Sequence, residues 1–157
     1  MKALVVYDSV FGNTEKVALA ISQALLTKAD VSTQRISEST TSDFTGVNLL
    51  IVGSPTRGFN PTPAISKWLR SLVPGSLKGI SVAAFDTRID SEEVGSKILT
   101  GMVKVFGYAA KPIAGKLAKK GGDLKLEPEG FIVTGTEGPL REGELERAAE
   151  WAQQLTD

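Results

Sequence analysis

Cysteine and histidine are both absent from the 157 residues of this sequence. Without cysteine, the chain has neither disulfide bonds nor thiolate chemistry. Without histidine, it lacks the most common general base and the most common metal ligand of proteins. The composition therefore excludes the serine, cysteine and metal-dependent hydrolases that rely on histidine, and we expect neither a catalytic side chain nor a metal site.

Long apolar runs are also missing. No stretch approaches the ~20 apolar residues that a membrane-spanning helix needs, and Met1-Lys2 lead directly into an apolar strand rather than into a signal peptide. The length favours one domain over residues 1–157, and a hydrophobic content of 41% is that of an ordinary globular protein. We therefore expect a single cytoplasmic domain with no membrane partner.

Charge is balanced over the whole chain but not along it. Eighteen lysine and arginine residues stand against 18 aspartate and glutamate residues. Nevertheless, seven lysines fall within Lys97–Lys125 against Asp123 alone, and seven glutamates fall within Glu127–Glu150 against two arginines. Such blocks are usually solvated faces. Because no aromatic residues alternate with the lysines, we expect no nucleic-acid partner.

Five short segments rich in β-branched or apolar residues predict strands. The second of them alternates polar and apolar residues, so it is expected to be less buried than the others. The last one is split by Pro128-Glu129-Gly130. In chain order the predicted strands are Ala3–Tyr7, Val31–Ile36, Val47–Val52, Ile80–Phe85 and a strand within Leu124–Val133.

Helical spacing of apolar residues separates these strands. Asn13 begins one helix, and Asn60–Pro63 supplies a cap and early prolines for a second. A third helical region, from about Ser91 to Lys120, is interrupted by glycines and Pro112, and a final helix follows Gly138-Pro139. The apolar stripes are Val17, Ile21, Ala24 and Leu25; then Ile65, Trp68, Leu69 and Leu72; and finally Leu145, Ala148, Ala149, Ala152 and Leu155.

Buried strands joined by helices predict a parallel sheet with helices on both faces. Five such units in 157 residues fit the α/β, doubly wound, five-stranded fold with strand order 2-1-3-4-5. Ligands of this fold bind beyond the carboxyl ends of the strands, at the switch point between strands 1 and 3. This rule selects the loops Asp8–Thr14, Ser54–Asn60 and Asp86–Ser91 as the site.

The first loop joins a buried strand to a helix, where successive backbone N–H groups form an anion site. Ser9 and Thr14 add hydroxyl groups, and Gly12 permits a close backbone approach. The alternative is a plain turn in which Asn13 or Thr14 caps the helix. The residues of the predicted anion site are Ser9, Val10, Phe11, Gly12, Asn13 and Thr14.

The second and third loops meet the first at the same edge of the predicted sheet. Phe59 is placed to stack on a planar ring; alternatively it packs under its loop as a local hydrophobic plug. The third loop offers polar donors and acceptors; alternatively it is a solvated turn capped by Ser91. The predicted binding residues in these loops are Ser54, Pro55, Thr56, Arg57, Gly58 and Phe59, with Asp86, Thr87 and Arg88.

The segment from Tyr7 to Glu15 resembles the phosphate loop of the flavodoxin family, a run of hydroxyl residues followed by Gly-x-Thr. Gly53-Ser54-Pro55-Thr56 resembles the flavin-ring loop of the same family. The resemblance covers essentially the whole chain and matches a short-chain flavodoxin. It implies bound FMN, with its phosphate on Ser9–Thr14 and its ring between Ser54–Asn60 and Asp86–Asp90.

Three features depart from the family. Phe11 stands where a serine or threonine is usual, and no aromatic residue lies between Asp86 and Ser91 to cover the outer ring face. The chain is neutral rather than acidic, with Arg57 and Arg88 in the ring loops. We therefore expect a reduced flavin couple less negative than in acidic flavodoxins, unless Asp86 and Asp90 neutralise the two arginines.

The resemblance implies an electron-transfer flavoprotein that shuttles electrons between redox partner proteins, as a monomer or weak dimer. The alternative is an FMN-dependent NAD(P)H:quinone-type oxidoreductase of small acceptors, which an open ring face and Arg57 favour. A phospho-receiver module is excluded, because the third strand ends Val52-Gly53-Ser54 without the aspartate that such a module needs.

Overall fold

One parallel sheet organises the chain, and the computed structural model describes residues 1–38, 40–90 and 107–157. The strands are β1 (Lys2–Tyr7), β2 (Asp30–Arg35), β3 (Leu49–Pro55), β4 (Ser81–Ile89), β5 (Asp123–Leu124) and β6 (Glu129–Val133). The helices are α1 (Asn13–Leu25), α2 (Pro63–Ser71), α5 (Ala110–Lys119) and α6 (Glu144–Gln154). The predicted helical region from Ser91 to Lys120 includes α5, and its residues 91–106 lie outside the described part. Among the helices described, none is long and apolar enough to cross a membrane.

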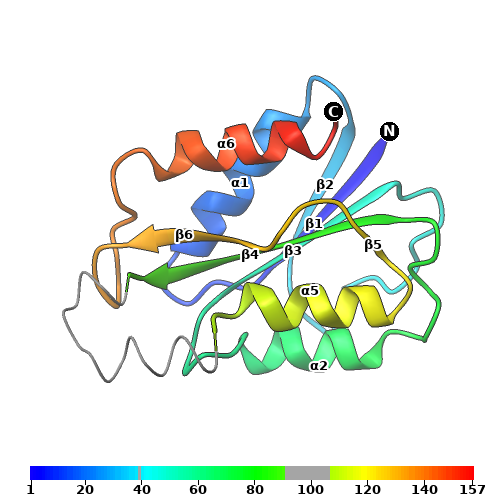
Figure 1. The fold of residues 1–157 in the computed structure, drawn as a ribbon, viewed down its shortest axis with the longest axis horizontal. Coiled ribbons are helices and arrows are strands. Elements are labelled where there is room, and N and C mark those ends of the chain that lie inside the picture. The colour runs from blue at the N-terminus through cyan, green and yellow to red at the C-terminus, as the bar shows by residue number, and fades with distance from the viewer. Residues whose placement is uncertain (39, 91–106) are drawn as a thin grey trace.

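The strand order confirms the doubly wound topology. The strands pair in the order β2-β1-β3-β4-β5, and β6 also pairs with β4. β5 pairs with the first residues of β4 and β6 with the last ones, so the final strand is split as predicted. The predicted place of the split is wrong in part, because the break lies at residues 125–128 and Glu129 and Gly130 belong to β6. Pro128 lies between the two segments, where its missing N–H costs no ladder hydrogen bond. Figure 1 shows α1 and α6 on one face of the sheet and α2 and α5 on the other.

The two faces of the sheet bury separate apolar layers. On the α1 and α6 side, the rings of Phe85, Phe131 and Trp151 pack edge to face at 6.1–6.2 Å. Gly53 lies directly under this cluster, since a Cβ there would be 2.0 Å from the Phe85 ring. On the α2 and α5 side, the predicted inner face of α2 is buried throughout, and Thr62 and Pro63 begin that helix as predicted.

The predicted apolar stripe of the last helix is wrong at Leu145. This residue is 40% exposed, whereas Trp151 is buried. Left-handed Gly143 precedes the first turn of α6 and sets its rotation, so Ala148, Trp151, Ala152 and Leu155 face the sheet. Their i, i+3, i+4, i+7 spacing is that of one helix face.

The third predicted loop is also wrong, because β4 continues through Asp86, Thr87 and Arg88 to Ile89. Residues Phe85–Ile89 pair with β6 over its whole length, which supplies backbone partners beyond the expected strand end. Asp86 and Thr87 are buried, so the alternative of a solvated turn fails for them as well. Polar residues are tolerated in this strand because their side chains find partners inside the protein.

The outer edge of β6 is covered by polar side chains of α6. The Glu144 carboxylate accepts a hydrogen bond from the Ile132 N–H at 2.6 Å, and Arg147 donates to the Gly130 carbonyl. Arg147 also pairs with Glu144 at 2.7 Å and with Glu129 at 3.1 Å. These contacts satisfy backbone groups that an exposed edge strand leaves open.

The contacts of Glu144 at the edge of β6 predict that the free energy of unfolding depends on pH. Burial alone would raise the pKa of Glu144, but hydrogen bonds from Arg147 and the Ile132 N–H hold the pKa below its ordinary value. The resulting stabilisation is present above the unfolded-state pKa and is lost as the pH falls through the folded-state pKa. We expect Glu144→Gln to lower the free energy of unfolding by about 1–3 kcal/mol at neutral pH and by less in acid.

Chemical denaturation over a pH series measures this effect. Glu146→Gln, at an exposed position of the same helix, is the matched control and should follow the wild type. If the free energy of unfolding depends on pH in the same way for Glu144→Gln and wild type, Glu144 does not stabilise the outer edge of β6.

Candidate functional site

A cavity of about 290 Å³ lies at the carboxyl ends of β1, β3, β4 and β6. It is at the lower end of the size range of small-molecule sites. Ser9, Gly12, Ser54, Phe59 and Asp86 are not among its wall residues. The predicted residues that line it are Val10, Phe11, Asn13, Thr14, Pro55, Thr56, Arg57, Gly58, Thr87 and Arg88; the walls that the sequence analysis missed are Ile89, Val133 and Thr136.

The first loop is held by Ser9 rather than by a cap on α1. The Ser9 hydroxyl oxygen accepts hydrogen bonds from the N–H groups of Gly12, at 3.1 Å, and Glu15, at 3.4 Å. Gly12 has φ +93° and caps α1 without a side-chain hydrogen bond. The alternative of a cap by Asn13 or Thr14 is therefore wrong. Asn13 donates to the Glu137 carbonyl, and the Thr14 hydroxyl lies 2.7 Å from that of Thr87.

Backbone N–H groups of this loop remain open. Within the described residues, no protein atom accepts a hydrogen bond from the N–H of Val10, Phe11, Asn13 or Thr14. A Cβ placed on Gly12 would meet nothing within 4 Å, so the space beside the loop is open. Clustered N–H groups at a helix N-terminus bind anions. The loop therefore has the donor set of a phosphate site.

The second loop is a tight turn closed at its base. Arg57 and Asn60 exchange backbone hydrogen bonds of 2.8 and 3.0 Å, and the two residues between them, Gly58 and Phe59, have φ of +53° and +70°. The predicted start of this loop is wrong, because β3 continues through Ser54 to Pro55. Ser54 is fully buried, and its hydroxyl accepts from the Thr62 N–H at 3.0 Å, which joins the end of β3 to the start of α2. Ser54 thus supports the loop from below the cavity.

Phe59 is half-buried and does not line the cavity. A positive φ is rare for a bulky side chain and marks backbone strain. The predicted stacking of Phe59 on a planar ring stays a prediction. The aromatic ring that does line the cavity is that of Phe11.

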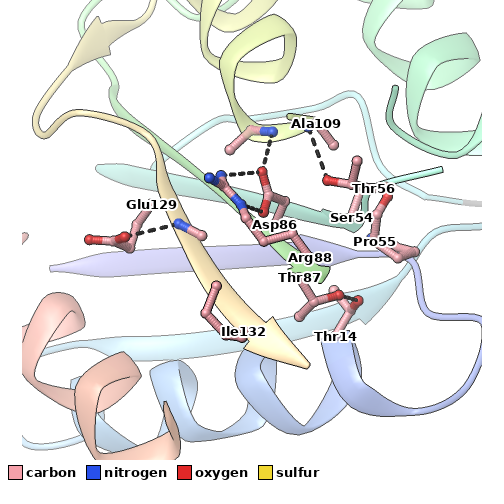
Figure 2. Close-up of polar contacts among 12 residues, drawn as sticks. Thr14, Ser54, Pro55, Thr56, Asp86, Thr87, Arg88, Ala109, Glu129 and Ile132 are labelled. Atoms are coloured by element: carbon pink, nitrogen blue, oxygen red, sulfur yellow. Dashed lines mark hydrogen bonds and ion pairs between the residues drawn. The ribbon is translucent and has the colours of Figure 1, made fainter. Parts of the chain in front are cut away.

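Asp86 connects the sheet to the start of α5, as Figure 2 shows. Its carboxylate is fully buried and accepts hydrogen bonds from Arg88 Nε and Nη2, both at 2.7 Å. It also accepts from the Ala110 N–H at 2.9 Å, while the Thr56 hydroxyl accepts from the Ala109 N–H at 3.1 Å. Asp86 in β4 and Thr56 just after β3 therefore cap α5, whose own N-cap residue, Ala109, provides no side-chain oxygen.

Two opposing effects act on the pKa of Asp86. Burial raises the pKa of Asp86, and the hydrogen bonds and charge of Arg88 act in the opposite direction. Arg88 also stacks over the Tyr108 ring at 3.6 Å and passes over Gly130, where a Cβ would be 2.1 Å from Arg88 Nε. Asp86 therefore neutralises the charge of Arg88, as the alternative in the sequence analysis proposed.

Arg57 differs from Arg88. Its guanidinium lies 5.9 Å from the centre of the Phe11 ring, across the cavity mouth. Within residues 1–38, 40–90 and 107–157, no carboxylate lies within 4.0 Å of it. Of the two arginines in the cavity wall, Arg88 is neutralised by Asp86, whereas Arg57 has no ion pair in the described part of the chain.

The described cavity wall combines backbone N–H donors, hydroxyl groups and two arginines. Among the described residues, no cluster of carboxylates is suited to hold a metal ion. Val133 ends the last strand and Thr136 follows it, so the rule that strand ends share one edge would have found both residues. Nothing in the local sequence places Tyr108 beside Arg88.

Comparisons with known proteins identify the fold. No family model matches the chain. An uncharacterized protein of Methanocaldococcus jannaschii is 34% identical over 73 residues, which are 43% of this chain and 19% of that relative. The match thus spans about a fifth of the curated relative.

Several solved structures match nearly the whole chain. Flavodoxin 1 from Bacillus cereus has a TM-score of 0.75 at 17% identity, covering 99% of this chain and 97% of its own. A flavodoxin from the domain Archaea has a TM-score of 0.76 at 23% identity, covering 99% and 96%. Two-electron reduced Megasphaera elsdenii flavodoxin has a TM-score of 0.67 at 25% identity, covering 96% and 97%. The chain has the flavodoxin-like fold, which confirms the predicted fold class.

Proposed function

We propose that this chain of flavodoxin-like fold binds FMN in the cavity and carries electrons between redox partner proteins. One observation carries the proposal: the open N–H groups around Gly12 lie at the switch point of the sheet, where this fold binds its ligands. A phosphate group needs such donors, and the cavity beside them continues along both neighbouring strand ends.

The residues present fit the parts of FMN in different ways. The N–H groups of Val10, Phe11, Asn13 and Thr14 would hold the phosphate without any charged side chain. The wall from Pro55 to Gly58 and the wall from Thr87 to Ile89 would hold the ring between them. When bound, FMN supplies the redox chemistry, taking up two electrons and one proton. The protein's part is to bind, orient and shield, which needs no histidine or cysteine.

Reconstitution of the purified protein with FMN tests the proposal. We expect saturable binding of one FMN per chain, seen as quenching of flavin fluorescence and a shift of the flavin absorption bands. A protein that quenches no FMN fluorescence would contradict the cofactor assignment. Steady turnover of a quinone by NAD(P)H, without a partner protein, would contradict the carrier role in favour of the reductase.

A redox prediction follows from the difference between the two arginines. Reduced FMN carries one more negative charge than oxidised FMN, and a nearby cation favours it. We expect Arg57→Gln to lower the two-electron midpoint potential by up to about 30 mV, the value for a tenfold change in equilibrium. Potentiometric titration measures it.

Arg70→Gln, at an exposed position of α2, removes the same charge outside the cavity and is the matched control. Equal potentials for wild type and Arg57→Gln would show that Arg57 does not tune the flavin.

A further inference from the structure

A groove of about 550 Å³ runs between α5 and the connection from β5 to β6. Helix α5 presents Ala114, Gly115 and Ala118 to the groove, and Leu124 and Pro128 face them. The small side chains let another molecule approach the α5 backbone closely. In Figure 1, α5 lies on the face of the sheet opposite α1 and α6.

The α5 side of this groove carries uncompensated positive charge. Lys111 lines the groove, Lys119 is exposed on the same helix, and Lys116 is half-buried between them. In the part of the chain that the structure describes, none of these lysines has a carboxylate within 4.0 Å. Glu127 on the opposite wall is the acidic residue that lines the groove.

The α6 face of the sheet shows the opposite pattern. On α6, Arg147 is paired with Glu144 and Glu129, so the charge of this arginine is neutralised locally. The chain is neutral overall. Among the described helices, α5 carries three lysines without a carboxylate within 4.0 Å, whereas α1 and α2 carry one each and α6 carries none.

The groove adjoins the cavity through one side chain. Arg88 lines both spaces, and it stacks over Tyr108, which lines the groove. A molecule seated in the groove is therefore separated from the cavity by the Arg88–Tyr108 stack. This position suits a partner that must come close to the cofactor without entering its site.

We propose that the α5 groove is the docking surface for a redox protein with an acidic surface, which passes single electrons to the flavin. The inference rests on the proposed function. The lysines complement an acidic partner electrostatically, and complementary charge accelerates encounter. A protein fits better than nucleic acid, because the groove has small apolar walls and Tyr108, the aromatic residue among its described lining residues, is stacked on Arg88.

Stopped-flow reduction of the FMN-loaded protein by a reduced plant-type ferredoxin tests the proposal. In each encounter one electron leaves the reduced iron–sulfur cluster and enters the flavin. We expect Lys111→Gln/Lys119→Gln to lower the second-order rate constant about tenfold at low ionic strength, and the difference to disappear at high salt. Mitochondrial cytochrome c, a basic electron acceptor, should not react more slowly with this variant.

Lys2→Gln/Lys78→Gln removes the same charge at the start of β1 and shortly before β4, from two lysines that have no carboxylate within 4.0 Å in the described residues, and is the matched control. An equal loss of rate in this control would attribute the effect to net charge and overturn the docking site. So would an unchanged rate in the α5 variant, or no reduction by ferredoxin while FMN is bound. Tight binding of a short DNA duplex, abolished by the α5 substitutions, would overturn the choice of partner. Failure to bind FMN at all would instead contradict the proposed function.

Discussion

Asp86→Ala is expected to lower the free energy of unfolding by about 3–5 kcal/mol, the usual cost of removing one partner of a buried ion pair. The substitution leaves the Arg88 guanidinium without its bidentate partner and the Ala110 N–H without an acceptor. Both groups lie at the junction of β4 and α5, so the start of α5 should loosen. Urea denaturation measures the change.

Two variants separate charge from packing. Asp86→Ala/Arg88→Met removes both charges and should be less destabilised than Asp86→Ala, because no charge is left unpaired. Asp43→Ala, at an exposed position where the carboxylate accepts hydrogen bonds from Thr45, is the control and should leave the unfolding transition close to that of the wild type. A stable Asp86→Ala protein that fails to bind FMN would show instead that Asp86 contacts the cofactor, as the sequence analysis predicted.

The sequence is sufficient to predict the sheet because its strands are short apolar segments separated by helical spacing. Leu50 and Ile51 face opposite apolar layers, so their consecutive burial indicates a strand covered on both sides. The end of β4 is not predictable in this way. Asp86 and Arg88 have the composition of a loop, and they are accommodated in a strand through contacts with Ala110 and β6, which are distant in the sequence.

The candidate site, too, is predictable from the sequence only in part. The edge of the sheet and most of its wall residues follow from topology, because parallel strands end at one edge. The roles of individual residues do not follow. Ser9 and Ser54 both offer hydroxyl groups in the right loops, yet each is turned to its own loop backbone. Only the packing of distant segments decides which polar group faces the cavity.

Phosphate dependence is the largest effect we expect on ligand binding. Riboflavin lacks the phosphate that the N–H groups of Val10–Thr14 would bind. Each hydrogen bond to a charged group contributes about 1.5–3 kcal/mol, so two of them correspond to about 10²–10⁴-fold in affinity. Wild type should therefore bind FMN more tightly than riboflavin by this factor. Thr14→Ala removes the Thr14 hydroxyl as a hydrogen-bond donor to the phosphate and should weaken FMN binding about ten- to hundredfold. Fluorescence titration with both flavins measures these affinities.

Gly12→Val places a β-branched residue at φ +93°, where the loop has open space but an L-residue is strained. The loop must change its conformation, so the preference for FMN over riboflavin should largely disappear. Gly46→Val is the matched control, because Gly46 also has a positive φ and open space but lies between β2 and β3, outside the Ser9–Thr14 loop. It should lose stability while keeping the full preference for FMN. Equal affinities of the wild type for the two flavins would show that the loop does not bind the phosphate.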